Sequence, residues 1–323
     1  MGSPSWRSNA SQEMLQLRAK SLAAIREFFT TRKVLEVETP ALSTAGTSDL
    51  GLEPMLARDS INGTVLRYLH TSPEYAMKRL LAGGSGDIYQ ICRVFRAAEQ
   101  GRWHEPEFTL LEWYRLGWNE TQLMEEVESL LHRLLHSTRS LAPAGRMSYR
   151  QVFRDFLHTD RFENTEEVRA AVSKAGIDLP PNISEDGILD LALSEVIVPQ
   201  LDPDAITFIY DFPANQAALA RIKAEKPPVA ARFEAFCSGI ELANGFAELT
   251  DAAEQRQRFE LDLTRRRRDG RHEPLLDEHF LAALEHGLPP CAGVAIGLDR
   301  VLALAAGVSS VAATMSFPHG PSE

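Results

Sequence analysis

Cysteine is scarce in this sequence, and its cysteines form no recognisable pattern. The 323 residues include three cysteines, Cys92, Cys237 and Cys291, which lie far apart and form no CxxC pair. An odd number of widely spaced cysteines argues against a disulfide framework and against a structural zinc site. We therefore expect a protein of a reducing compartment, the cytoplasm.

Long apolar runs are also missing. Residues 1–9 contain no apolar segment of the kind that a secretory signal needs. The most apolar late stretch, residues 291–308, is interrupted by Asp299 and Arg300. No segment has the length and apolarity of a membrane span, so we expect no membrane association.

An excess of positive charge is the third absence. Asp and Glu number 45 against 34 Lys and Arg, which gives a formal charge of −11. Such a chain has no general electrostatic attraction for nucleic acid, although a local basic patch could still bind RNA. Residues 265–268 form a basic run, which predicts a solvated helix end that could also meet an acidic partner. The composition, 44% hydrophobic and 24% charged, is that of a globular protein.

The spacing of apolar residues predicts both helices and strands. Helices are expected over 11–31, 73–81, 119–136, 251–268 and 299–306. Strands are expected over 34–38, 65–70, 88–96, 108–116, 206–212, 232–236, 240–247 and 294–298. Hairpin-like loops separate these strands more often than crossover helices, which favours an α+β fold with a mainly antiparallel sheet of about six or seven strands flanked by helices. We interpret 1–323 as a single domain with a small, mostly helical insertion at about 139–200.

The first cluster of polar residues spans two of these strands. Arg96 lies at the end of one, and Glu112 and Tyr114 lie on the next. Strand alternation places Glu112 and Tyr114 on the same face, so a guanidinium, a carboxylate and a phenol could converge. The alternative is a solvated hairpin whose charges point outward.

The second cluster places two carboxylates around an Asn-Gly pair. Glu241 and Glu248 flank Asn244 and Gly245. Asn-Gly favours a turn or bulge with positive φ, which would bring both carboxylates to one site. Such a pair could hold Mg²⁺ or neutralise a substrate ammonium. An ordinary hairpin with surface acids is the alternative.

The third cluster is a strand of small residues that runs into a helix, over residues 293–304. Arg300 lies in the first turn of that helix. The helix dipole disfavours a cation there, so we expect an anionic or stacking partner for Arg300. The alternative is a local surface pair with Asp299.

Together these segments resemble the signature motifs of class II aminoacyl-tRNA synthetases. Residues 28–42, with Pro40, resemble motif 1, residues 93–114 resemble motif 2 and residues 293–304 resemble motif 3. ELANGFAELTDA and EPEFTLLEWY are similar to the lysine-specific subgroup. Only 27 residues precede Phe28, too few for the anticodon-binding OB domain of lysyl-tRNA synthetases. SPEYAMKRLLA and YQICRVFRA are similar to the free-standing paralogues that modify elongation factor P.

The resemblance implies a two-step, AMP-forming reaction. ATP and (R)-β-lysine, or lysine, would give an aminoacyl-adenylate, and a lysine side chain of elongation factor P would then take the acyl group. The implied cofactors are ATP and Mg²⁺, and the implied assembly is a homodimer through motif 1. Binding of tRNA is not expected.

The resemblance also implies roles for individual residues. Arg96, Glu241 and Arg300 would be catalytic: Arg96 would clamp the α-phosphate and the substrate carboxylate, and Arg300 would stack on adenine opposite Phe108. Glu241 and Glu248 would hold the metal ion. The implied ATP site comprises Arg96, Ala97, Ala98, Glu105, Phe108, Glu241, Leu242, Gly297 and Arg300. The implied amino-acid site comprises Ser72, Pro73, Glu74, Glu112, Tyr114, Asn244, Glu248 and Ala295.

Four positions depart from the family's pattern, and one of them is Lys33, where motif 1 often has glycine. Ala98 stands where the family has glutamate, Glu105 where asparagine is common, and Ala295 where lysyl-tRNA synthetases have glycine. Three other functions stay open: a minimal lysyl-tRNA synthetase-like enzyme, a small-molecule amino-acid ligase, and a non-catalytic paralogue that binds an amino acid.

Overall fold

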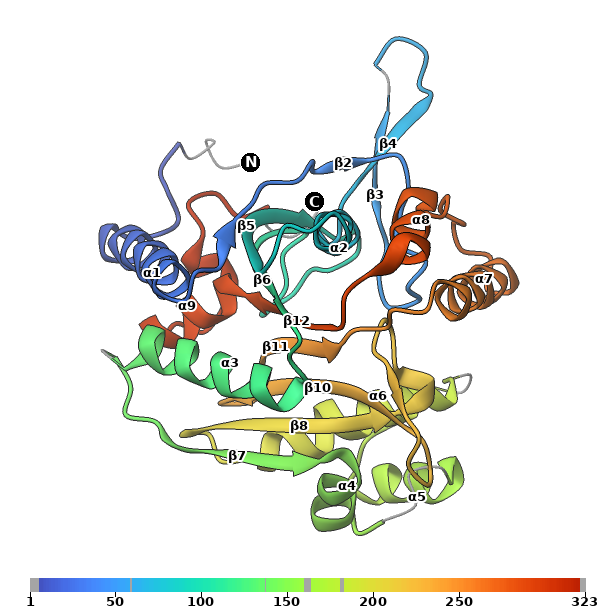
Figure 1. Ribbon diagram of the computed structural model, residues 1–323. Helices are drawn as coiled ribbons and strands as arrows, with labels where there is room; N and C mark the ends of the chain where they lie inside the picture. The colour runs from blue at the N-terminus through green and yellow to red at the C-terminus, as the bar shows by residue number, and fades with distance from the viewer. Residues whose placement is uncertain (1–5, 59, 137, 160–163, 181–182, 320–323) are drawn as a thin grey trace.

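The centre of the protein is a nine-stranded mixed sheet (Figure 1). The structure is a computed structural model that describes residues 6–58, 60–136, 138–159, 164–180 and 183–319. The strand order is β1-β5-β6-β12-β11-β10-β8-β7, and β9 pairs with β10. The strands are β1 (Leu35–Glu36), β5 (Ile88–Phe95), β6 (Glu107–Leu116), β7 (Ala142–Ser148), β8 (Ala205–Pro213), β9 (Ile222–Lys223), β10 (Val229–Cys237), β11 (Ile240–Ala247) and β12 (Cys291–Gly297).

The pairing confirms the predicted α+β fold with a mainly antiparallel sheet. All neighbours from β5 to β8 in that order are antiparallel, and only the outer pairs β1–β5 and β7–β8 are parallel. The sheet has more strands than expected because short or irregular strands extend its edges. One of them, β7, lies within 139–200 and contains Pro143 and Gly145, which an edge strand tolerates.

The predicted helices form with small differences at their ends. Ser11, Asn119 and Asp251 each cap a helix by accepting a hydrogen bond from a backbone N–H of the first turn. The helices of the described residues are α1 (Gln12–Thr31), α2 (Glu74–Ala82), α3 (Glu120–Leu135), α4 (Tyr149–Leu157), α5 (Thr165–Lys174), α6 (Glu185–Leu191), α7 (Ala252–Arg268), α8 (Glu278–Gly287) and α9 (Leu298–Ala306). None of them is long and apolar enough to cross a membrane.

Strand β6 shows how the sheet separates two layers. Trp113 packs into the core that α1, α3 and α9 form with the sheet. Its neighbour Tyr114 packs into a second core with residues of α2 and α8, because successive strand residues face opposite sides. Glu112 lies two residues before Tyr114 and therefore shares its face. The candidate site lies on this face.

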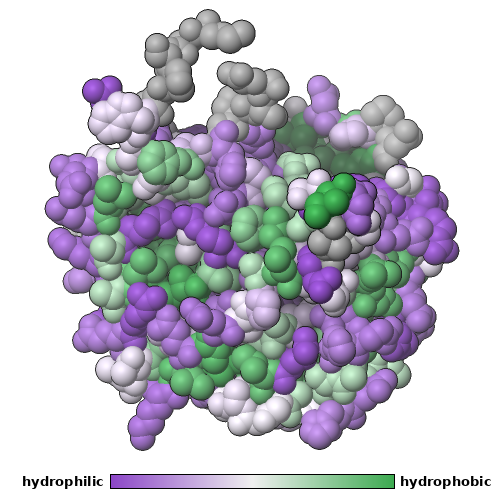
Figure 2. All heavy atoms as spheres, turned by 90° about the horizontal axis from the view of Figure 1, so that it is seen from above, coloured by the Kyte–Doolittle hydropathy of each residue, from purple (hydrophilic) through white to green (hydrophobic). Residues whose placement is uncertain are grey.

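A second sheet of three antiparallel strands lies beside α8. Its strands are β2 (Leu42–Ser43), β3 (Met55–Arg58) and β4 (Val65–Leu69), and the β3–β4 hairpin projects from the body (Figure 1). On the face shown in Figure 2, hydrophilic side chains surround small separate groups of apolar ones, as is usual for globular proteins.

Candidate active site

Two cavities meet on the Tyr114 face of the sheet. One, the arginine cavity, has a volume of about 230 Å³. The other, the acidic cavity, has a volume of about 450 Å³. Both are lined by Arg96, Asn244 and Ala295. Groups bound in the two cavities would therefore meet at these three residues.

The pairing of the strands builds this junction. Glu112 on β6 lies opposite Ala295 on β12, Ala295 lies opposite Asn244 on β11, and Asn244 lies opposite Glu234 on β10. Directly paired residues share a face of a sheet. Four residues that are far apart in the sequence thus form one row across the floor of the site.

Arg300 has the anionic partner that its position predicted. Its Nη1 donates hydrogen bonds to the carboxylate of Glu241 (3.3 Å) and to the Glu241 carbonyl (3.0 Å). The alternative, a surface pair with Asp299, is wrong: Asp299 is buried, pairs with Arg18 and accepts a hydrogen bond from the backbone N–H of Thr109 at 2.7 Å. Arg300 is thereby held at the wall of the arginine cavity.

Arg96 and Phe108 form the second side of the arginine cavity. The guanidinium carbon of Arg96 lies 5.0 Å from the centroid of the Phe108 ring, and Nε donates to the carbonyl of Thr71 at 3.3 Å. A planar ring placed here would lie beside both an aromatic face and guanidinium groups, an arrangement that suits a purine. Of the other predicted ATP-site residues, Glu105, Leu242 and Gly297 also line this cavity.

Ala97 and Ala98, which were predicted as ATP-site residues, are not among the residues that line the arginine cavity. Ala97 pairs with Glu53, and Ala98 has a left-handed backbone with φ 62°. That turn brings Glu99 into the cavity wall, 3.4 Å from Arg96 Nη1. Glu99 therefore supplies the carboxylate that the departure at Ala98 appeared to remove.

His104 is a site residue that the sequence analysis missed. Arg300 Nη2 lies 2.8 Å from His104 Nε2, and an arginine N–H can only donate, so Nε2 is unprotonated in this contact. Burial and the charge of Arg300 lower the pKa of His104. The only sequence signal was its place in the polar loop beside Glu105.

The turn at Asn244 and Gly245 that was expected to bring Glu241 and Glu248 together does not form. Strand β11 is continuous through Asn244 and Gly245, so the Cα atoms of residues seven apart lie roughly 20 Å from each other along it. Gly245 serves close packing and not a turn, since a Cβ there would lie 2.5 Å from the Phe233 ring. Among the described residues, no three His, Cys, Asp or Glu side chains are grouped to hold a metal ion.

Glu234, which was not predicted, is the carboxylate that joins Glu241. The hairpin turn falls at Ser238 and Gly239, with φ 52° and 75°, and brings the two acids to one region. Glu234 is ion-paired with Arg232, yet burial and the charge of Glu241 raise the pKa of Glu234 to about 7. Two carboxylates in one region offer oxygen ligands of the kind that a divalent cation takes.

The amide of Asn244 supports the same assignment. Its Nδ2 donates to Glu234 at 3.3 Å, while its buried Oδ1 has no hydrogen-bond partner in the described part of the chain. Buried polar atoms are normally satisfied, so Oδ1 is available to a ligand. Asn244 was predicted as a substrate residue, and it lies at the junction of the cavities.

In the acidic cavity, Glu112 is held from two sides. Its carboxylate accepts hydrogen bonds from Ser72 Oγ at 2.6 Å and from the Tyr114 hydroxyl at 2.7 Å. Burial and the charge of Glu74 raise the pKa of Glu112 to about 7. Ser72 also accepts a hydrogen bond from the backbone N–H of Glu74, and Pro73, between them, is the N-cap residue of α2.

Lys78 lies between two of the predicted substrate carboxylates. Its Nζ lies 2.6 Å from Glu74 Oε1 and 2.6 Å from Glu248 Oε2, and its side chain is 1% exposed. Burial disfavours the charge of Lys78, but the two carboxylates outweigh burial and raise its pKa. Burial also raises the pKa of Glu248 to about 8. The sequence signal was the i,i+4 spacing of Glu74 and Lys78 on one helix.

The charges at this end of the acidic cavity do not balance. Glu74, Glu112 and Glu248 face one another and one ammonium group, that of Lys78. When ionised, they leave two negative charges. A ligand with two ammonium groups would neutralise them.

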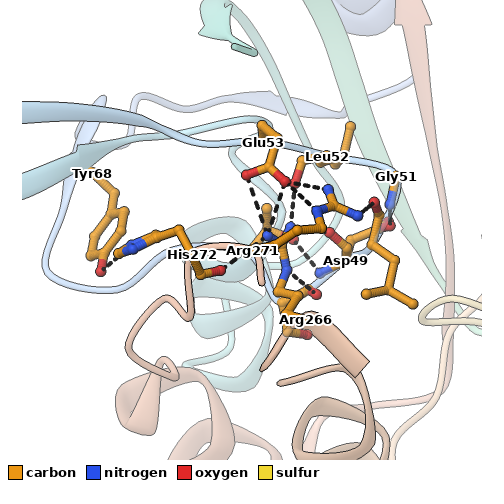
Figure 3. A network of polar contacts seen from close by, with 11 residues as sticks. Asp49, Gly51, Leu52, Glu53, Tyr68, Arg266, Arg271 and His272 are labelled. Carbon is orange, nitrogen blue, oxygen red and sulfur yellow. Dashed lines mark hydrogen bonds and ion pairs between the residues drawn. The ribbon is translucent and has the colours of Figure 1, made fainter. Parts of the chain in front are cut away.

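One wall of the acidic cavity is a loop, residues 48–52, that Arg266 holds in place (Figure 3). Arg266 is fully buried, contrary to the predicted solvated face of 265–268, and donates to the carbonyls of Ser48 (2.9 Å), Asp49 and Leu52. Arg266 and Arg271 both bind Glu53, whose carbonyl accepts a hydrogen bond from Ala97 N at 2.8 Å. The loop is therefore tied to the segment that follows Arg96.

Gly293 is required where Tyr114 and Glu248 approach β12. A Cβ at residue 293 would lie 2.3 Å from Tyr114 Cε1 and 2.5 Å from Glu248 Oε1. We expect Gly293→Ala to raise the KM for the amino acid roughly 10- to 100-fold, because both buried side chains must shift. ATP–pyrophosphate exchange measures this effect. Gly145→Ala, on β7, adds a Cβ at an ordinary 3.6 Å from Thr207 and should leave the KM unchanged.

Comparison with known proteins gives one family and a consistent set of relatives. The model of the family "tRNA synthetases class II (D, K and N)" matches residues 4–321. The chain is 46% identical over 321 residues to the elongation factor P–(R)-beta-lysine ligase of Pectobacterium carotovorum subsp. carotovorum (strain PC1), with 97% of each chain covered. It is 44% identical over 320 residues to the protein of that name from Vibrio parahaemolyticus, covering 97% of this chain and 98% of the relative. The protein of that name from Salmonella gallinarum is 45% identical over 318 residues, with 97% of each covered.

Proposed function

The chain belongs to the class II tRNA synthetase family (D, K and N), and on that premise we propose that it is the ligase that attaches (R)-β-lysine, or lysine, to a lysine side chain of elongation factor P. The relatives that bear this name match the chain over nearly its full length. An ATP-dependent ligase of this kind first activates its amino acid as an adenylate and then transfers it to an amine.

The junction of the two cavities carries this proposal. The arginine cavity offers Arg96, Phe108 and Arg300 to a nucleotide, and the acidic cavity offers an excess of two negative charges to a diamino acid. Arg96 lies where they meet, so its planar guanidinium can hold a phosphate oxygen and a carboxylate oxygen together. Positioning and charge stabilisation then account for the activation step.

Class II synthetase-like ligases use ATP, generally with Mg²⁺. In this chain Glu234 and Glu241 would hold the ion, which would neutralise phosphate charge when bound. Arg300, paired with Glu241 at 3.3 Å, is placed to contact the same phosphates.

The direct test is intact-mass spectrometry of elongation factor P incubated with the protein, ATP and Mg²⁺. One sample contains (R)-β-lysine, one α-lysine and one no amino acid. A gain of one lysyl residue with an amino acid present supports the proposal, and the ratio gives the substrate preference. No gain in mass, with ATP–pyrophosphate exchange still active, contradicts elongation factor P as acceptor and leaves tRNA and small amines to be tested. No exchange with any amino acid contradicts activation itself.

The charged end of the acidic cavity predicts a pH dependence. Glu112 and Glu248, with pKa values raised to about 7 and about 8, are partly protonated in the free protein near neutral pH. A diammonium ligand binds the ionised form, so binding releases protons and strengthens as pH rises. We expect the KM for the amino acid to fall by at least about tenfold from pH 6 to pH 8 and to level off only above the higher of the two pKa values. A KM that is constant over this range, measured by pyrophosphate exchange, would contradict the assignment.

We also propose a homodimer formed through residues 28–42 and a location in the cytoplasm, where translation factors act. Leu35 and Leu42, in that segment, are 56% and 50% exposed, which suits a covered surface. Light scattering after size-exclusion chromatography would give twice the chain mass for a dimer. Leu35→Glu should shift the mass toward the monomer.

A further inference from the structure

We propose that Lys78 is a specificity-determining residue: a fixed counter-ion that limits the acidic cavity to ligands with two ammonium groups. This inference rests on the proposed activation of a diamino acid and adds to it. Lys78 lies in the second turn of α2, one turn after Glu74, and it was not among the predicted site residues.

The contacts of Lys78 place its charge inside the site. Nζ lies 2.6 Å from a carboxylate oxygen of Glu74 and 2.6 Å from one of Glu248, and both of those residues line the acidic cavity. The Lys78 and Glu248 side chains are each 1% exposed. A cation so deeply buried between two carboxylates acts on the ligand site as a permanent charge.

Groups from three further elements lie around Lys78 and its carboxylates. From β6, Glu112 and Tyr114 face the same cavity. On β12, the buried thiol of Cys291 is close enough to Glu248 and Lys78 for their charges to shift its pKa. From α8, the Phe280 ring centroid lies 5.8 Å from Nζ. The largest charge effects on Glu112 come from Glu74 and Lys78, and those on Glu248 come from Lys78, Glu74 and Glu112.

The charge at this end therefore depends on Lys78. With it, three ionised carboxylates leave two negative charges, which a diamino acid neutralises. A ligand with one ammonium would leave a buried carboxylate uncompensated, which is costly. Without Lys78, a diamino acid neutralises only two of the three carboxylates, and the third needs another cation or a proton. The carboxylates would therefore stay protonated up to a higher pH than in the unmodified protein.

A purely structural role for Lys78 makes a different prediction. If Lys78 only tied α2 to the end of β11, its loss would weaken substrate binding equally at all pH values. A counter-ion role moves the pH at which binding is lost. The pH profile of the KM separates the two.

The experiment measures the KM for the diamino acid by ATP–pyrophosphate exchange between pH 6 and pH 9. We expect Lys78→Met to move the midpoint of the profile up by about one pH unit or more, with the KM raised on the order of tenfold at pH 7 and the difference narrowing toward pH 9. A midpoint equal to that of the unmodified protein would overturn the proposal.

Lys223→Met is the matched control. Lys223 also lies between two carboxylates, 2.8 Å from Glu120 Oε1 and 2.5 Å from Asp211 Oδ1, but none of the three lines the acidic cavity. Its removal should leave the midpoint in place. A shift equal to that of Lys78→Met would show that any lost lysine moves the profile and would overturn the proposal.

Glu74→Gln tests the same idea with the opposite sign and keeps Lys78. The charge of Glu74 raises the pKa of both Glu112 and Glu248, so its loss should move the midpoint down. This variant decides the question if thermal unfolding shows that Lys78→Met does not fold. An unmodified protein without exchange activity refutes the proposed function, whereas an active protein whose midpoint neither variant moves refutes only the role of Lys78.

Discussion

Replacing Arg96 by glutamine should lower the rate of ATP–pyrophosphate exchange about 10²- to 10³-fold, the loss typical when a donor to developing charge is removed. Arg96 is the only strong cation shared by the two cavities in the described part of the chain. Its side chain is 24% exposed and held by Thr71 and Glu99. The guanidinium is thus oriented before a ligand binds, and glutamine keeps a polar side chain but lacks the charge.

Two further variants test whether the loss of exchange activity is specific to the guanidinium group of Arg96. Arg96→Lys keeps the positive charge but lacks the planar guanidinium group. Its exchange rate should lie between those of Arg96→Gln and the unmodified protein, because an ammonium group cannot bind two oxygens side by side. Arg93→Gln, three residues earlier in the chain, is the control. It removes a guanidinium group that is 49% exposed and whose nearest carboxylate oxygen, on Glu107, is 3.7 Å away, a long distance for an ion pair. It should leave exchange unchanged. Equal losses at both positions would contradict a special role for Arg96.

Replacing Arg266 by methionine should lower the free energy of unfolding by about 3–5 kcal/mol, the usual cost of breaking a buried ionic network from one side. The side chain is fully buried, and its loss leaves the carbonyls of Ser48, Asp49 and Leu52 without this donor (Figure 3). Methionine fills much of the volume, so the change isolates the polar contacts. Urea unfolding measures the difference.

The neighbouring arginine provides the comparison for Arg266. Arg267 is 70% exposed and pairs with Glu273 at the surface. Arg267→Met should leave the urea midpoint unchanged, since exposed ion pairs contribute little. Because the loop over 48–52 lines the acidic cavity, Arg266→Met should also raise the KM for the amino acid at temperatures where it is folded. Equal stability of the two variants would contradict the network described here.

The helices and strands could be predicted because their signals are local. Apolar spacing alone places helices within a few residues of those observed, and Ser11, Asn119 and Asp251 cap three of them. Arg300 illustrates a partial success. The helix dipole required a partner for it, but only the structure identifies that partner as Glu241 and not Asp299.

The errors share one cause, which is pairing between distant residues. Asn-Gly has the composition of a turn, yet Asn244 and Gly245 lie inside a strand because β10 and β12 pair with both sides of β11. That register separates Glu241 from Glu248 and brings Glu234 into the site. Nothing local in the sequence distinguishes the two outcomes.

The sequence by itself determined the class of fold, the order of its elements and the types of side chain available for the site, since periodicity, capping and motif spacing depend on neighbours along the chain. Only the tertiary structure decided which of those side chains work together. The row from Glu112 to Glu234, the ion pairs of Lys78 and the burial of Arg266 all depend on contacts between segments that are far apart in the chain. The physical reason is that charges act over distances in space, and the strand register and helix packing that set those distances are properties of the whole fold.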